Sequence, residues 1–224
     1  MFTLLIGNKN YSSWSMRPWL ALKLADVPFE ENLVPLLEDG YKEKLLAFTP
    51  GGKVPALRHE FGGQSRVVWD SLAICEYLAE CFPHTHLWPE NPGARAEARC
   101  VVAEMHSGFG ALRKHMPMNM RESLPGQGQD DEQVLKDIAR ISEIWITAIH
   151  GYSAPFGRSF LFGAPSIADC FFAPVVSRFK TYQPRLDPIA QSYVETITQW
   201  PLFQEWETAG LAESWVWEKF QVPG

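Results

Sequence analysis

The feature that most constrains the fold is a change of pattern near residue 83 of this 224-residue chain. Before it, apolar runs at 3–6, 29–33, 54–57 and 66–69 alternate with helix-like stretches at 13–24, 41–48 and 70–79. Short apolar runs bounded by turn residues are typical of buried strands, and apolar residues that recur once per helical turn are typical of helices. The expected order is β-α-β-α-β-β-α. Since proline is tolerated in a first helical turn, Pro18 predicts that the first helix begins near Ser15.

The rest of the chain has only helical patterns. A stretch rich in proline and histidine, residues 84–92, is the predicted linker, and helices are expected over 94–116, 133–150, 167–182 and 189–208. We therefore predict an α/β domain over residues 1–83 and an all-helical domain over 93–224. The length suits two small domains.

Composition excludes several classes of protein. The formal charge is −6 and no block of Lys or Arg occurs, which argues against a dedicated binder of nucleic acid or of anionic membranes. The most apolar region, 160–176, is interrupted by Asp169, so no membrane span is expected, and the start shows no secretory leader.

Cysteine and histidine usage indicates a reducing compartment and no metal site. The four cysteines stand at 75, 81, 100 and 170 without a Cys-x-x-Cys pair, and the six histidines are scattered. This pattern predicts reduced thiols in a cytoplasmic protein.

Serine residues gather in the loop after the first strand, Tyr11-Ser-Ser-Trp-Ser15. Hydroxyls at the start of a helix can stabilise a thiolate or a phosphate by hydrogen bonding, and they can equally be helix caps. Without a Gly-x-Ser-x-Gly elbow, a serine hydrolase is a poor interpretation.

Two further pairs suggest a ligand site. If the Val54-Pro55 bond is cis, the Val54 backbone offers its N–H and C=O to an extended ligand, although a trans proline at a strand start is the more frequent case. Asp70-Ser71 stands at a helix start, where Ser71 and the helix N-terminus suit a carboxylate and Asp70 an ammonium. A plain helix cap is the alternative.

Ser166-Ile-Ala-Asp169 has the spacing of a capping box. Phenylalanines on both sides predict that Asp169 is buried. We interpret this motif as a folding element rather than a catalytic one.

The order of these motifs resembles the soluble glutathione transferase family over residues 2 to about 210. The resemblance implies a thioredoxin-like first domain that holds glutathione and a helical second domain that supplies the co-substrate pocket. The serine loop is most similar to the zeta-class pattern Ser-Ser-Cys-Ser-Trp-Arg. Trp14 stands in place of that cysteine and Met16 in place of that tryptophan, which weakens the case for the zeta-class isomerase activity but not for the fold.

Carried over to this chain, the resemblance implies that the Ser12 hydroxyl stabilises the glutathione thiolate, with Ser13 as the rival. Val54, before a cis Pro55, would pair with the cysteinyl backbone of glutathione. The γ-glutamyl end would bind Asp70 and Ser71, and weaker candidates for the glycyl carboxylate are Lys53 and Lys42.

The co-substrate pocket is expected between the serine loop and the first helix of the second domain. Its expected lining is aromatic, methionine-rich and permissive, and part of it is equally interpretable as core: Trp14, Met105, Phe109, Leu112, Arg113, Met116 and Trp215, with Trp217 as a further tail residue.

The resemblance predicts a homodimeric transferase that conjugates glutathione to small hydrophobic electrophiles. A glutathione-dependent isomerase of the maleylacetoacetate type and a glutathione peroxidase use the same thiolate and stay open. A cysteine-dependent disulfide reductase is disfavoured, because no cysteine falls in residues 1–74. A non-catalytic interaction protein with the same fold is the alternative from another class.

Overall fold

The first 81 residues of the structure form a four-stranded sheet with three helices. The computed structural model describes residues 1–36, 38–153 and 160–217. Its first elements are β1 (Phe2–Ile6), α1 (Ser13–Leu24), β2 (Phe29–Leu33), α2 (Tyr41–Phe48), β3 (Ala56–Phe61), β4 (Gln64–Trp69) and α3 (Ser71–Cys81). The strand order is β2-β1-β3-β4; β1 is parallel to β2, and β3 is antiparallel to both β1 and β4. The predicted element order is confirmed.

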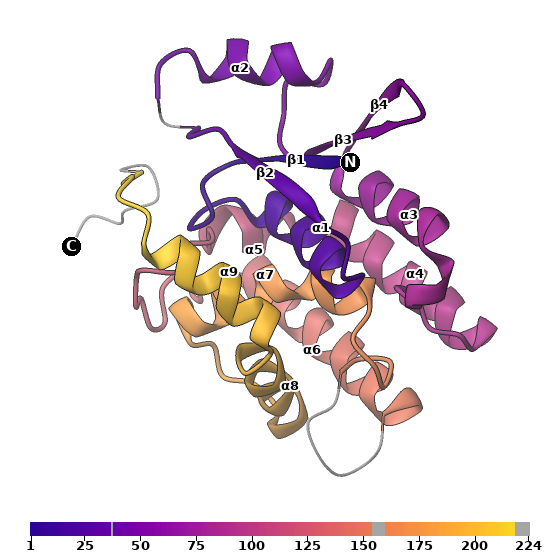
Figure 1. Ribbon diagram of the computed structural model, residues 1–224. Coiled ribbons are helices and arrows are strands. Elements are labelled where there is room, and N and C mark those ends of the chain that lie inside the picture. Colours follow the sequence, from indigo (N-terminus) through magenta and orange to yellow (C-terminus); the bar gives the residue numbers. More distant parts are fainter. Residues whose placement is uncertain (37, 154–159, 218–224) are drawn as a thin grey trace.

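Both faces of the sheet are covered, which explains why β1 is apolar at successive positions. Side chains alternate between the faces of a strand. Leu4 and Ile6 belong to the main core with α1 and α3, whereas Leu5 packs on the opposite side against Leu45 and Phe48 of α2. Figure 1 shows α2 alone on the outer face and α1 and α3 between the sheet and the remaining helices.

The described chain after residue 81 is helical, as predicted. After the short 3-10 helix η1 (Pro83–Thr85), its elements are α4 (Pro92–Ser107), α5 (Gly110–His115), α6 (Glu132–Tyr152), α7 (Ile167–Tyr182), α8 (Pro188–Thr198) and α9 (Pro201–Leu211). Residues 154–159 and 218–224 of the expected second domain lie outside the described part. No helix within the described residues combines the length and apolar composition needed to cross a membrane.

Helix α7 is the central, most buried helix of the helical region. It packs against α1, α4 and α8, and nearly all its side chains are buried. Its start is the expected capping box, in which Asp169 accepts from the Ser166 backbone N–H at 2.9 Å. Asp169 is fully buried and also accepts hydrogen bonds from Leu161 N–H and the Tyr193 hydroxyl.

Two long helices that we expected are each broken in two. The helix over 94–116 is interrupted at Gly108 and Phe109, where Phe109 adopts a left-handed φ of 57° and a Cβ on Gly108 would lie 2.8 Å from Glu104 O. The helix over 189–208 breaks at Trp200, because the following Pro201 disfavours helical backbone before it.

Smaller shifts affect the other boundaries. β3 begins at Ala56 rather than at residue 54, since the Val54-Pro55 pair lies before the ladder. α1 begins at Ser13 rather than near Ser15, because Ser12 caps it, and Pro18 is accommodated inside the helix.

Candidate functional site

The serine loop is held rigidly between β1 and α1. The Ser12 backbone N–H bonds to Asn8 O at 2.8 Å, and the Ser12 side chain caps α1. Asn10 ties the loop to the second half of the chain, because its Oδ1 accepts from Met120 N–H and its Nδ2 donates to Asn119. Ser12 retains 8% exposure and lines a cavity of about 310 Å³.

The neighbouring serines have different partners. Ser13 Oγ accepts a hydrogen bond of 3.3 Å from Arg178 Nη2, and Ser13 lines the same cavity. Ser15 is fully buried, and its Oγ lies 2.7 Å from Ser12 Oγ. Of the three serines, Ser12 and Ser13 line this cavity and Ser15 does not.

A second cavity, of about 560 Å³, joins the two other sequence pairs. Its lining includes Lys53, Val54 and Pro55 from one segment and Asp70 and Ser71 from another. The Val54-Pro55 peptide bond is cis. The structure thus brings together five residues that the sequence singled out separately.

The start of α3 has one unused polar group. Asp70 Oδ1 caps the helix by accepting from Leu72 N–H at 2.8 Å, and its other oxygen lies 3.2 Å from His106 Nε2. The Ser71 hydroxyl is buried and has no hydrogen-bond partner among the described residues. Since a buried hydroxyl is stabilised by a partner, Ser71 suits a ligand carboxylate at this helix start.

Trp14 and Val54 line both cavities, so the two are neighbours. Two guanidinium groups lie near the Trp14 ring, with Arg17 Cζ at 4.2 Å and Arg113 Cζ at 5.6 Å from its centroid. His106 meets the Trp14 ring edge-on at 5.4 Å. Trp14 and Val54 together therefore form the wall that the two cavities share.

The 310 Å³ cavity is lined by positive charge. Arg113 and Arg178 both line it, and none of its described lining residues is an aspartate or a glutamate. Burial lowers the pKa of Arg178 to about 10 and that of the nearby Arg17 to about 9, which leaves both charged at neutral pH. An uncompensated buried charge is unfavourable, so this cavity favours an anionic ligand.

Trp217, which follows α9, helps to line this cavity. The Trp217 backbone N–H donates to the Tyr11 hydroxyl at 3.0 Å, and both residues line the cavity. Trp215 is not part of this lining; its Nε1 donates to Glu38 at 3.1 Å. Of the two tail tryptophans, Trp217 is the one beside the serine loop.

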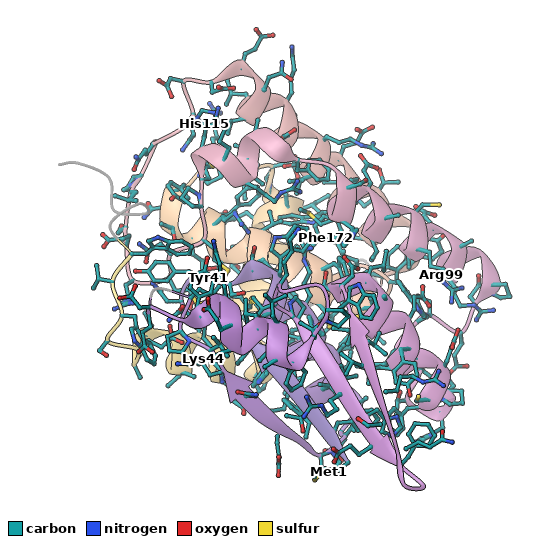
Figure 2. All side chains as sticks on the ribbon, turned by 90° about the horizontal axis from the view of Figure 1, so that it is seen from above. Met1, Tyr41, Lys44, Arg99, His115 and Phe172 are labelled. Atoms are coloured by element: carbon teal, nitrogen blue, oxygen red, sulfur yellow. The ribbon has the colours of Figure 1, made fainter. Side chains whose placement is uncertain are left out.

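Other expected pocket residues lie elsewhere. Four of them are buried in the main core and line neither cavity: Met105, Phe109, Leu112 and Met116. Met105 lies on α4 and Leu112 on α5, on the two sides of the break at Gly108 and Phe109. Lys42 is exposed and lines a separate hollow of about 260 Å³ on α2, the helix that carries Tyr41 and Lys44 in Figure 2.

The family is decided by comparison with known proteins. The sequence profile of the glutathione S-transferase N-terminal domain matches residues 11–81, and that of the C-terminal domain matches residues 92–209. The chain belongs to the glutathione S-transferase family. It is an enzyme family, and the glutathione transferase fold expected from the sequence is confirmed.

Several similar transferase-family proteins carry isomerase names. A "Probable maleylacetoacetate isomerase" of Caenorhabditis elegans is 40% identical over 101 residues, 45% of each chain. The maleylacetoacetate isomerase of Pseudomonas aeruginosa is 29% identical over 79% of this chain and 81% of its own. The match to the nematode relative thus spans less than half of either protein.

Solved structures of glutathione transferase-family proteins have a similar fold. The maleylacetoacetate isomerase from Anaeromyxobacter dehalogenans 2CP-1, with GSH bound in its active site, has a TM-score of 0.66 and 26% identity, covering 92% of this chain and 94% of its own. A glutathione transferase Omega 2S from Trametes versicolor has a TM-score of 0.68 at 20% identity, with 94% of each chain covered, and shows the shared fold.

Sequence reasoning missed an arginine and a histidine of this candidate site, Arg178 and His106. Arg178 was hidden in an apolar helix, where a single arginine on an otherwise buried face was the available signal. His106 was set aside because no second histidine accompanied it. Both are contributed by helices of the second half, and no spacing along the chain connects them to the serine loop.

Proposed function

We propose that the protein is a glutathione-dependent isomerase that acts on a small unsaturated acid. The observation that carries this proposal is the pair of arginines, Arg113 and Arg178, beside Ser12 in a cavity whose described lining includes no acidic residue. Both guanidinium groups donate hydrogen bonds to neutral oxygens of the protein, and a neutral hydrophobic electrophile would bring no negative charge to them. The isomerase names of similar proteins add independent support.

Glutathione would lie across the two cavities. Its γ-glutamyl ammonium suits Asp70, and its α-carboxylate suits the unpartnered Ser71 hydroxyl at the start of α3. Val54, which lines both cavities, would pair with the cysteinyl backbone, and Lys53 would face the glycyl carboxylate. The sulfur would then reach the serine loop.

At that loop Ser12 is the better candidate for the thiolate-stabilising hydroxyl. A free thiol with a pKa near 8.5 is only slightly ionised at neutral pH, so a hydrogen bond to the thiolate promotes the reactive form. Ser13 Oγ accepts a hydrogen bond from Arg178, which holds this hydroxyl beside the guanidinium group. We therefore propose that Ser13 and Arg178 bind the carboxylate of the acid substrate and that Ser12 donates to the glutathione sulfur.

The chemistry follows from these positions. The thiolate adds to one carbon of the cis double bond, and the displaced electron pair moves onto the conjugated carbonyl. Rotation about the resulting single bond is followed by return of that pair, which restores the double bond as trans and expels the thiolate. The arginines would hold the carboxylate throughout, and no proton is consumed.

Turnover of two substrates tests this proposal. With glutathione present, the purified protein is expected to isomerise maleylacetoacetate much faster than it conjugates a neutral chloronitroarene. Faster conjugation would overturn the isomerase assignment in favour of a transferase. Absence of glutathione binding in calorimetry at millimolar ligand would instead favour a non-catalytic interaction protein.

Conjugation is the second candidate, and Trp14 is the observation that favours it. An aromatic wall at the junction of the two cavities suits flat electrophiles. Glutathione S-transferase GstB of Escherichia coli K12 is 33% identical over 42% of this chain and 44% of its own. A peroxidase would use the same thiolate, and hydroperoxide turnover measures it directly.

We also propose a cytoplasmic homodimer. All four cysteines are free thiols, which suits a reducing compartment. The family resemblance implies that the first domain packs on the helices of a second copy. Sedimentation is expected to give twice the mass of the 25.4 kDa chain, and a monomer would contradict the dimer.

A further inference from the structure

Ser15 is a buried hydroxyl between the backbone of β1's end and the serine loop. It has 0% exposure, so it does not contact a ligand in either cavity. Its Oγ accepts a hydrogen bond of 3.1 Å from Gly7 N–H and lies 2.7 Å from Ser12 Oγ. Ser15 therefore connects the sheet to the residue proposed to face the glutathione sulfur.

The donor in the Ser12–Ser15 contact follows from a count of hydrogen-bonding groups. A serine hydroxyl has one proton to donate and two lone pairs that accept. Among the described residues, Ser12 Oγ is the acceptor available to the Ser15 proton. If Ser12 donated instead, the Ser15 proton would be left unsatisfied in the interior, which is unfavourable. The arrangement that satisfies both groups has Ser15 donating.

When Ser15 donates, the Ser12 hydroxyl can act toward a ligand only as a hydrogen-bond donor. Its Oγ accepts from the Ser15 hydroxyl at 2.7 Å and, more weakly, from Ser15 N–H at 3.4 Å. Both lone pairs are then occupied, and the Ser12 proton remains to be donated. Because Ser12 lines the 310 Å³ cavity, that proton is available to a group inside it.

We infer that Ser15 is a positioning residue: by donating its hydroxyl proton to Ser12 Oγ, it directs the Ser12 O–H toward the glutathione thiolate. The chain of donors runs from Gly7 N–H through Ser15 to Ser12 and ends on the sulfur. Consecutive hydrogen bonds polarise one another, so the Ser12 proton becomes a stronger donor. This inference rests on the proposed use of glutathione.

The pKa of the bound glutathione thiol tests the inference. It is measured from the pH dependence of thiolate ultraviolet absorbance in the native protein and in Ser12→Ala, Ser15→Ala and Ser15→Cys variants. Loss of a hydrogen bond to the charged sulfur in Ser12→Ala is expected to raise this pKa by roughly one to two units. Ser15→Ala is expected to raise it by roughly half a unit to one unit.

Two comparisons separate positioning from packing. Ser15→Cys keeps a side chain of the same shape, slightly larger, whose thiol is a weak donor, so it is expected to behave as Ser15→Ala does. In a Ser12→Ala background, Ser15→Ala is expected to add nothing. Ser142→Ala is the matched control, because its hydroxyl bonds only to Ile138 O within α6, and it should leave the thiol pKa unchanged.

The measurements distinguish failure of the Ser15 inference from failure of the proposed function. If Ser12→Ala raises the thiol pKa and Ser15→Ala does not, or if the two shifts simply add, Ser15 has no positioning role while the proposed function stands. If Ser12→Ala has no effect, the serine assignment and this inference both fail. A native protein that binds no glutathione overturns the proposed function and, with it, the relay.

Discussion

Arg178 Nη2 donates a hydrogen bond of 3.3 Å to Ser13 Oγ, which joins the central helix α7 to the serine loop at the start of α1. Arg178 is 4% exposed and otherwise donates to two carbonyls, Met116 O and Pro174 O. None of the ion pairs found among the described residues includes it. One residue thus links the helical half to the site and brings an unbalanced positive charge there.

Replacing this arginine is expected to impair the acid substrate selectively. In Arg178→Met, kcat/KM for maleylacetoacetate should fall by about 10- to 100-fold, the equivalent of one charged hydrogen bond. Conjugation of a neutral chloronitroarene should change much less. Arg178→Lys keeps the positive charge but loses the planar guanidinium, and it is the control. Its kcat/KM for maleylacetoacetate should lie between those of the native protein and of Arg178→Met. Equal losses for both substrates would indicate a structural role only.

Ser71 offers a test that separates binding from stability. Because its buried hydroxyl has no protein partner, Ser71→Ala should leave the free energy of unfolding of the ligand-free protein unchanged or slightly higher. The same change should weaken glutathione binding by about 3- to 10-fold, the worth of one hydrogen bond. Calorimetry and urea unfolding measure the two effects. A destabilised variant with normal affinity would contradict the assigned role.

Asp169 is expected to be the most sensitive position outside the site. Asp169→Ala leaves the N–H groups of Leu161 and Ser166 and the Tyr193 hydroxyl without their acceptor inside the core. The free energy of unfolding should fall by about 3 to 5 kcal/mol, as measured by urea denaturation. The exposed cap Asp187, which bonds only Ile189 N–H, is the matched control, and Asp187→Ala should cost about 1 kcal/mol.

Asp169 also predicts a pH dependence of stability. Burial raises its pKa to about 6, above the value of about 3.9 in an unfolded chain, although its donors favour the charged form. The folded state therefore binds this proton more tightly. Its contribution to stability is fully present below about pH 4, is lost as the pH rises to about 6, and amounts to about 3 kcal/mol.

The difference between the native protein and Asp169→Asn isolates this term, because other carboxylates titrate equally in both. Unfolding free energies measured at several pH values should show this difference declining from pH 4 to pH 6 and then levelling. A difference that does not vary with pH would mean that Asp169 titrates near its ordinary value in the folded protein.

The sequence alone determined the local structure. Alternating apolar runs predicted the strand and helix order of residues 1–83, because strand and helix periodicity depends on near neighbours. The capping box at Ser166 and Asp169 was predicted for the same reason: its two hydrogen bonds span three residues. Ser12, Val54 and Asp70 were found as candidates because each stands at a loop or element end.

Only the tertiary structure decided what these residues face. The stripe from Met105 to Met116 has helical spacing, but the structure buries it in the main core, where it lines neither cavity. Arg178 and His106 reach the site because α7 and α4 pack beside α1 and α3, and no spacing along the chain encodes that approach. Periodicity reports which side of a helix is buried; whether that side meets core or cavity depends on elements far away in sequence.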